Sequence, residues 1–217
     1  METKTPGILL QCIPYLGKKH ILKVFTLEEG LVSLMAKSTH SSALTSPFCI
    51  AEWVYEKRQS ELCSLKDGSV VEALLSLRQR YDTLTAAGSI AKDLILSQLP
   101  FKRNSDLYHL AAAYLQKLPT FAHPEILAAS FRLKLLLHEG LLSLQEQCCQ
   151  CELPARHLFQ GESYCLNHGP TPGTSFEEEE WQQLIVLGFA RQFSLLQNLN
   201  LVPKEKIEIL LKERLAH

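Results

Sequence analysis

The sequence lacks long apolar runs, and this absence argues against a helix that spans a membrane. Its most apolar stretch, FRLKLLLHEGLLSL, is interrupted by Arg132, Lys134, His138 and Glu139, whereas a membrane-spanning helix needs about 20 apolar residues. The first residues, METKTPGILLQ, also lack the basic and apolar segments of a secretory signal. Seven cysteines, an odd number, fit a reducing compartment better than a disulfide framework. We therefore expect a cytoplasmic protein.

Motifs of the common enzyme classes are missing as well. The sequence contains no GxxxxGK[ST], GxGxxG, GxSxG or HExxH pattern, which are the signatures of phosphate-binding loops, dinucleotide sites, esterases and zinc proteases. The zinc deaminase signature is also absent. The net charge of −1 argues against a nucleic-acid binder that is basic over its whole surface. Nothing in the sequence favours an enzyme.

What the first third of the chain does contain is a series of short β-type runs. GILLQCIPY, HILKVFT, GLVSLMAK, FCIAEWVY and ELCSL are separated by turn residues, which predicts five strands in a small barrel or sandwich. Gly30 follows TLEE and suits the positive φ that closes a hairpin. Three cysteines in these apolar runs are expected in the core: Cys12, Cys49 and Cys63.

Helical periodicity replaces the β pattern after Lys66-Asp67-Gly68. Asn104 or Ser105 suits an N-cap, Pro124 suits a first helical turn, and the acidic run from Glu177 to Glu180 complements the positive end of a helix dipole. The predicted helices are 69–79, 81–98, 105–117, 124–138, 176–199 and 203–215. The predicted fold class is α+β and multidomain, with a small β-barrel at 1–67 and a helical domain at 68–217 that carries an insert at 147–170.

The insert holds the most specific motif of the chain. Cys148-x-x-Cys151 is followed by Cys165-x-x-His168, and two such pairs can complete a tetrahedron of the ligands that zinc prefers. The site would be structural and closed, because all four positions are filled by protein. The alternative is a set of free cytosolic thiols near a surface histidine, with Cys149 as a competing thiol.

Cations and aromatic side chains alternate in the predicted barrel. A barrel of this kind can hold the phosphates of a single strand with cations and stack its bases on aromatic rings. The alternative is that the aromatic side chains fill the barrel and the lysines keep its rim hydrated. The candidate DNA-binding residues are Lys18, Lys19, His20, Lys23, Lys37, Lys57 and Arg58.

Taken in order along the chain, these features resemble the RecO family of recombination mediators. The resemblance covers nearly the whole chain, from GILLQ through VFTLEEGLVSLMAK and PFCIAEWVY to FRLKLLLHEG and the cysteine insert. Its most specific positions are Thr26, Gly30, Ala36 and Lys37, then Pro47-Phe48 with Glu52, and then Phe131, Leu133 and Gly140.

The resemblance implies an OB-fold barrel, a helical domain with a zinc-finger-like insert, and no enzymatic turnover. It implies binding to single- and double-stranded DNA and annealing of complementary strands, in a cytoplasmic, nucleoid-associated protein. It also implies partners: RecR, RecF, RecA, and the acidic C-terminal tail of single-strand-binding protein, which would dock on the helical domain.

Two departures from the family pattern affect these expectations. SerThrHisSerSer occupies 38–42, where many relatives have a glycine and a basic run, so this loop should attract phosphate less. His168 stands where cysteine is commoner, and imidazole is still a good zinc ligand. Two other functions remain open: an interaction adaptor whose OB module binds no nucleic acid, and a metal-dependent hydrolase.

Overall fold

The structure is a computed structural model that describes residues 2–17, 19–37, 42–58, 60–199 and 203–215. The chain divides into two compact units, Met1–Thr120 and Phe121–His217. No helix among the described residues is long and apolar enough to cross a membrane.

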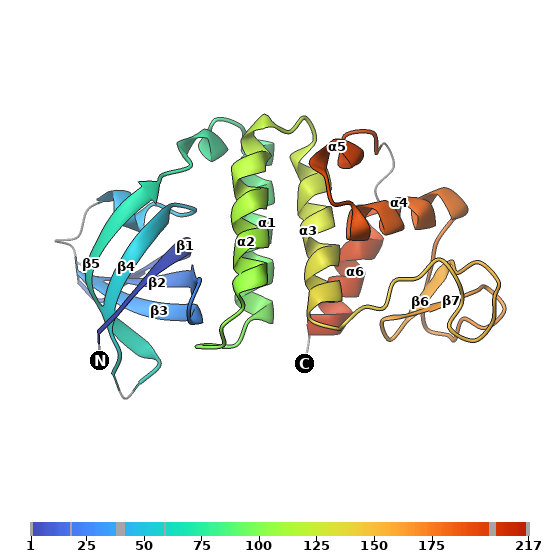
Figure 1. Ribbon diagram of the computed structural model, residues 1–217, viewed down its shortest axis with the longest axis horizontal. Coiled ribbons are helices and arrows are strands. Elements are labelled where there is room, and N and C mark those ends of the chain that lie inside the picture. The colour runs from blue at the N-terminus through green and yellow to red at the C-terminus, as the bar shows by residue number, and fades with distance from the viewer. Residues whose placement is uncertain (1, 18, 38–41, 59, 200–202, 216–217) are drawn as a thin grey trace. The chain divides into compact units, whose positions relative to one another are not determined.

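Five strands of the first unit form a closed barrel (Figure 1). The strands are β1 (Glu2–Tyr15), β2 (Lys19–Thr26), β3 (Gly30–Lys37), β4 (Ile50–Glu56) and β5 (Leu62–Glu72). Their order is β1-β2-β3-β5-β4, and β4 pairs with β1 to close the barrel. All pairs are antiparallel except β3 with β5. The predicted OB-type barrel is confirmed.

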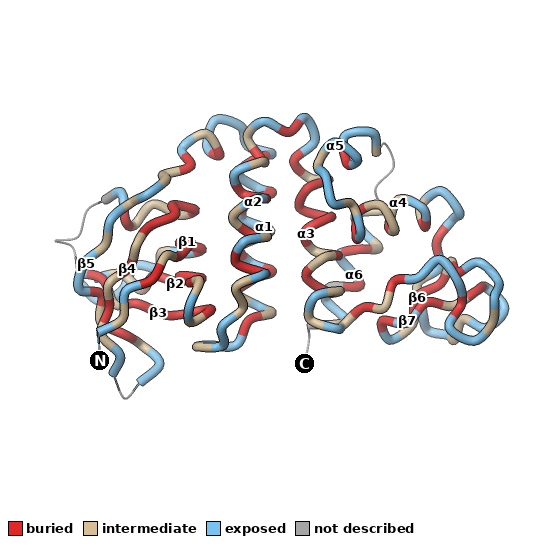
Figure 2. The backbone as a smooth tube through the Cα atoms, in the orientation of Figure 1, coloured by how far each residue is buried: buried red, intermediate tan, exposed pale blue. Residues whose placement is uncertain are grey.

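The barrel interior is a close-packed apolar core, and buried positions recur along its strands (Figure 2). Trp53 and Tyr55 are fully buried, and the indole N–H of Trp53 donates to the carbonyl of Gly7 at 3.0 Å. Cys49 and Cys63 are fully buried, and Cys12 packs against the cluster from its edge. The prediction that these thiols are core residues is confirmed for Cys49 and Cys63, whereas Cys12 is only partly buried.

The β2–β3 turn connects the barrel to the helices of its own unit. Gly30 has the predicted positive φ, 64°. A Cβ atom at this position would lie 1.9 Å from the carbonyl oxygen of Lys102, and the amide of Phe101 donates to the carbonyl of Leu31 at 3.1 Å. Only glycine combines this backbone conformation with such a close approach.

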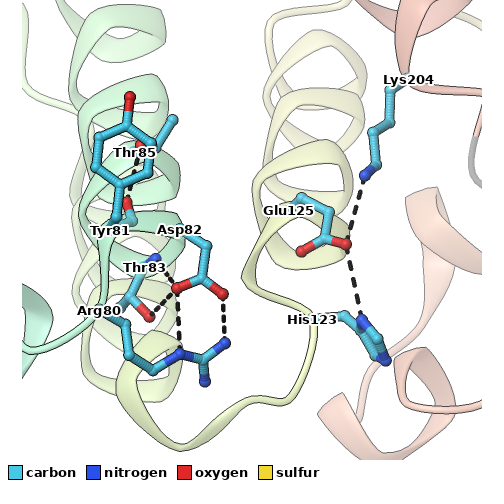
Figure 3. Close-up of polar contacts among 8 residues, drawn as sticks. All are labelled: Arg80, Tyr81, Asp82, Thr83, Thr85, His123, Glu125 and Lys204. Atoms are coloured by element: carbon cyan, nitrogen blue, oxygen red, sulfur yellow. Dashed lines mark hydrogen bonds and ion pairs between the residues drawn. The ribbon is translucent and has the colours of Figure 1, made fainter.

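Two helices complete the first unit: α1 (Tyr81–Ser97) and α2 (Ser105–Lys117). The side chain of Asn104 accepts from the amide of Leu107, so the predicted N-cap is confirmed at the first of its two candidate positions. At the start of α1, Arg80 pairs with Asp82, and the Thr85 hydroxyl donates to the carbonyl of Tyr81 at 2.8 Å (Figure 3). Short 3₁₀ turns occur at Ser42–Thr45, Leu75–Arg78 and Leu118–Thr120.

The predicted helix at 69–79 is wrong. Strand β5 continues to Glu72 and is followed only by the 3₁₀ turn at Leu75–Arg78. Lys66-Asp67-Gly68 is not a terminating turn but an irregularity within the strand, because the register with β4 shifts between the pairs Val54–Asp67 and Tyr55–Leu65. A bulge lets a strand absorb turn-type residues and continue. The expected domain boundary at 67 falls inside this strand, and the assignment of 1–67 and 68–217 as functional domains stays a prediction.

The second unit is built on α3 (Pro124–His138), α4 (Glu178–Phe189), α5 (Phe193–Leu196) and α6 (Lys204–Leu215). Pro124 lies in the first turn of α3 as predicted, and Glu177 and Glu180 form a capping box at α4. Glu125 of α3 pairs with Lys204 of α6 at 3.4 Å (Figure 3).

The single helix predicted at 176–199 is instead two helices. Ala190 leaves the helical conformation, with φ −55° and ψ 122°. The ammonium of Lys134 on α3 donates to the Ala190 carbonyl at 2.7 Å, and the hydroxyl of Ser130 donates to that of Leu187 at 2.7 Å. Side chains from α3 thus satisfy carbonyls at the end of α4, so the chain can turn there.

The insert folds as a small three-stranded antiparallel sheet. Its strands are β6 (His157–Phe159), β7 (Glu162–Tyr164) and β8 (Thr174–Ser175), in the order β7-β6-β8. The two cysteine-containing turns precede β6 and follow β7. The predicted zinc-finger-like insert is therefore present as a β structure within the helical unit.

Candidate metal centre and nucleic-acid interface

The four predicted ligands converge in space. One ligand atom from each of Cys148, Cys151, Cys165 and His168 lies within 4.8 Å of the other three. The sulfurs of Cys151 and Cys165 are 3.8 Å apart. Nδ1 of His168 lies 3.7 Å from the sulfur of Cys148 and 3.5 Å from that of Cys165.

These separations fit a tetrahedral zinc ion. With Zn–S bonds of about 2.3 Å and a Zn–N bond of about 2.0 Å, tetrahedral geometry places two sulfurs about 3.8 Å apart and a sulfur about 3.5 Å from the nitrogen. Zinc bound here would have four protein ligands and no open position for substrate. Its chemistry would be that of a structural cross-link.

Local hydrogen bonds shape both ligand turns. The amide of Cys148 donates to the carbonyl of Leu153 at 2.9 Å, which closes the first turn. The amides of His168 and Gly169 both donate to the carbonyl of Cys165, at 3.2 and 2.9 Å, which closes the second. In addition, the amide of Gln150 points at the sulfur of Cys148 at 3.4 Å. Backbone N–H groups that point at sulfur favour the thiolate, the form that binds metal.

The pKa values of Cys148 and Cys151 shift in opposite directions. Burial raises the pKa of Cys148, but hydrogen bonds from the backbone of Cys165 and Gln150 and from His168 outweigh it and lower that pKa to about 6. A backbone hydrogen bond at Leu153 lowers the pKa of Cys151, but burial and the nearby thiols of Cys165 and Cys148 together raise it above its usual value. Crowded thiols resist joint ionisation unless a cation compensates their charge.

Cys149 lies outside the cluster. Cys149 is exposed, and its amide donates to the carbonyl of Ser163 at 2.9 Å. The structure therefore brings together Cys148, Cys151, Cys165 and His168 and leaves out the competing thiol.

His157, which no sequence motif indicated, is buried beside the second ligand turn. Its Nδ1 lies 2.9 Å from the hydroxyl of Ser175 and its Nε2 lies 2.9 Å from the carbonyl of Pro170. A Cβ atom at Gly169 or Gly173 would overlap the imidazole. His157 thus ties the turn after the ligands to β8. The only available signal was the pair of glycines that flank Pro170 and Pro172.

Three of the predicted DNA-binding cations share one outer face of the barrel. Lys19 of β2 pairs with Lys37 of β3 and, on its other side, with Tyr15 of β1. Lys23 lies on the same face, opposite Ser33, and its ammonium is 2.8 Å from the hydroxyl of that serine. We call this surface the open face; its members in register are Gln11, Ile13, Tyr15, Lys19, Ile21, Lys23, Ser33, Met35 and Lys37.

Helix α2 of the same unit packs against the other end of β2. Phe25 of β2 is fully buried, with its ring 6.3 Å from that of Tyr108 on α2. Toward the far end of the strands, Ile13 is 36% exposed and Tyr15 is 44% exposed. The open face therefore offers cations beside exposed apolar and aromatic side chains.

The other predicted cations lie elsewhere. His20 alternates with Lys19 and pairs with Ala36, whose side chain is in the core. Lys57 pairs with Glu29 in the β2–β3 turn and lies over the ring of Phe101 at 5.3 Å, at the opposite end of β2 from Lys19. Arg58 lines a separate open hollow of about 240 Å³ next to Lys57. Lys18 lies outside the described residues.

A closed five-stranded OB-type barrel, followed by helices that carry a Cys3His cluster, defines the class: an OB-barrel protein with a zinc-finger-like insert. Residues 1–74 match the family described as "Recombination protein O N terminal". A DNA repair protein RecO of Chlamydia pneumoniae is 32% identical over 202 residues, which cover 89% of this chain and 80% of that protein. The RecO of Chlamydia trachomatis serovar D is 28% identical, with 89% and 83% covered.

A more distant relative gives the same result. The DNA repair protein RecO of Caldicellulosiruptor saccharolyticus is 28% identical over 155 residues, which cover 69% of this chain and 63% of that protein. The chain belongs to the RecO family, and the resemblance inferred from its sequence is confirmed.

Proposed function

We propose that the protein acts in DNA repair and homologous recombination by binding DNA on the open face. The observation that carries this proposal is the pairing of Lys19 with Lys37 across two strands, beside Tyr15. Like charges directly opposite each other destabilise a sheet. An anionic ligand would turn that cost into a binding contribution, because phosphates attract both ammonium groups.

The mechanism follows from the chemistry of this face. Lys19, Lys23 and Lys37 hold phosphates by charge, while Tyr15 and the apolar side chains beside it offer flat or apolar surface to bases. Such contacts are largely independent of sequence, and their strength falls steeply with salt. A protein that holds strands without reading them can bring complementary strands together, and strand annealing is the activity we infer.

The wider role rests on family membership. We infer that the protein is a non-enzymatic mediator that, with RecR, helps load RecA onto single-stranded DNA coated with single-strand-binding protein. RecF and the C-terminal tail of single-strand-binding protein are further proposed partners. The names of the relatives, all DNA repair protein RecO, support this role.

We further propose that the insert holds one structural zinc ion through Cys148, Cys151, Cys165 and His168. The support is the close match between the observed ligand separations and tetrahedral geometry. The ion would supply a cross-link between the two turns. The residues themselves provide the thiolates, oriented by backbone amides, and His157 fixes the turn that follows them.

The test of DNA binding is charge reversal on the open face. In Lys19→Glu we expect about a tenfold loss of affinity for single-stranded DNA at low salt, and a smaller slope of affinity against salt. Lys102→Glu is the matched control, because Lys102 is also exposed in the same unit but lies in the α1–α2 linker. Fluorescence anisotropy across a salt series measures both.

The same assay separates the proposal from its rivals. If the two variants bound DNA with equal affinity, the open face would not be the DNA-binding site. Retention of DNA only when single-strand-binding protein is present would identify an interaction adaptor. Nuclease or deaminase turnover by the metal-loaded protein would identify a hydrolase.

A further inference from the structure

A groove of about 370 Å³ lies between strand β1 and helix α1, beside the open face. Its walls are mostly aliphatic, and its polar groups are one amide and one ammonium. Its lining includes Leu10 and Gln11 of β1, and Gly88, Lys92, Ile95 and Leu96 of α1.

Two local features create this groove. The register of β1 with β2 shifts between Leu9 and Gln11, so the strand is irregular where it meets the helix. On the other side, Gly88 presents no side chain, and a Cβ atom there would meet nothing within 4 Å. Glycine in a helix interior costs about 1 kcal/mol relative to alanine. The sequence thus accepts a less stable helix at the position where a side chain would narrow the groove.

The groove is continuous with the open face through Gln11. This residue is exposed, lines the groove, and pairs across β1–β2 with Lys23 of the open face. Lys92, also exposed, extends the set of cations from the strands to the helix. A chain of phosphates that follows the lysines would therefore pass the mouth of the groove.

We propose that the groove accepts one unstacked nucleotide of a DNA strand bound on the open face. Its volume lies within the range of small-molecule sites, about 300–1,000 Å³. Ile95 and Leu96 would pack against the base, the Gln11 amide would hydrogen-bond its edge, and Lys92 would hold the adjoining phosphate. A base in a duplex is paired and stacked, so only a single strand fills the groove without the cost of unpairing. This inference rests on the proposed DNA-binding function and adds a preference for single strands.

Filling the groove tests the proposal. Gly88→Leu places an aliphatic side chain in it, and Gly88→Ala is the matched control that improves helix propensity while adding only a methyl group. We expect Gly88→Leu to weaken binding to a single-stranded thymidine oligonucleotide about fivefold and to leave binding to a duplex of equal length unchanged. Gly88→Ala should bind both as the original protein does.

A second variant keeps the test independent of the added bulk. Lys92→Gln should reduce the slope of log affinity against log salt by about 0.7 for the single strand and leave the slope for the duplex unchanged. Equal effects on single strand and duplex, or no effect in either variant, would overturn the groove. If Lys19→Glu lost binding while both groove variants bound DNA unchanged, the groove would not be a nucleotide site, but DNA binding on the open face would still hold. Unchanged binding in Lys19→Glu would reject the proposed function itself.

Discussion

The barrel and the cysteine insert solve the same folding problem by different means. The barrel buries large apolar side chains completely, among them Trp53, Tyr55 and Leu34. In the insert the buried groups include small or polar ones, such as Ala155, Ser163 and His157, together with the thiols of Cys148 and Cys165. The barrel has enough apolar contact to hold itself together. The insert buries fewer large apolar side chains, with Leu158 among them, and a bound metal ion would add folding free energy there.

This difference predicts that metal removal destabilises the insert and leaves the barrel unchanged. We expect it to have the largest effect of the proposed changes. Structural zinc contributes about 10–16 kcal/mol of apparent binding free energy in zinc-finger peptides, so a strong chelator should unfold the insert locally. We expect faster amide hydrogen exchange at β6 and β7, with barrel amides unchanged, and one zinc ion released per chain. Hydrogen exchange with mass spectrometry and elemental analysis measure these outcomes.

Two cysteine variants provide the control. Cys165→Ser should lose the metal and reproduce the effect of the chelator, whereas Cys149→Ser should retain it, since Cys149 lies outside the ligand cluster. Undisturbed exchange at β6 and β7 after complete loss of metal would show that the insert stands without it.

The next largest expected effect is a loss of stability in the barrel that leaves the insert unchanged. Gly30→Ala places a methyl group 1.9 Å from the Lys102 carbonyl oxygen and also requires a positive φ. We expect it to lower the free energy of unfolding of the barrel unit by about 3 kcal/mol or more. Urea denaturation of both proteins in a Trp181→Phe background, where Trp53 is the remaining tryptophan, measures the change by fluorescence.

Gly17→Ala is the matched control for this variant. Gly17 also has a positive φ, 69°, but a Cβ atom there would meet nothing within 4 Å. Gly17→Ala should lower the free energy of unfolding by only the cost of a positive φ in alanine, about 1–2 kcal/mol. Similar losses in the two variants would mean that the contact with the α1–α2 linker contributes little.

The two regions also differ in how far the sequence predicted them. The ranges of β3, α2 and α3 follow from local pattern, caps and proline, and all three are confirmed. The four convergent ligands follow from their spacing. The failures arise where distant contacts decide the structure: β5 continues through a turn-like stretch because β4 pairs with it, and α4 ends where Lys134 reaches Ala190.

The candidate DNA site shows the same limit. Composition identified the cations, but only strand register shows that Lys19 and Lys37 face each other while Lys57 lies at the other end of β2 beside Glu29. The role of His157 likewise depends on two contacts across the insert, with Ser175 and Pro170. These contacts join residues that are far apart in the sequence, so local sequence patterns do not reveal them.

The smallest effect concerns the helices beside the insert and their response to acid. A hydrogen bond from Lys206 on α6 lowers the pKa of Glu180 on α4 below its usual value of 4.5. A carboxyl group with a lowered pKa in the folded state stabilises the protein fully above its unfolded pKa, and this contribution disappears as the pH falls through the folded value. Because the pair is partly exposed to solvent, we expect it to contribute less than about 1 kcal/mol at neutral pH.

Glu180→Gln tests this expectation without removing the helix cap, because a glutamine oxygen can still accept from the amide of Glu177 as Glu180 does at 2.9 Å. The variant should be slightly less stable than the original protein at pH 7, and the difference should shrink as the pH falls below about 4.5 and vanish once the pH lies below the lowered folded pKa. Glu179→Gln, the adjacent exposed position, should change stability little at either pH. Paired denaturation curves cancel any acid-induced loss of metal common to both proteins. A difference that persisted in acid would mean that packing of the side chain on α6, rather than its charge, joins these helices.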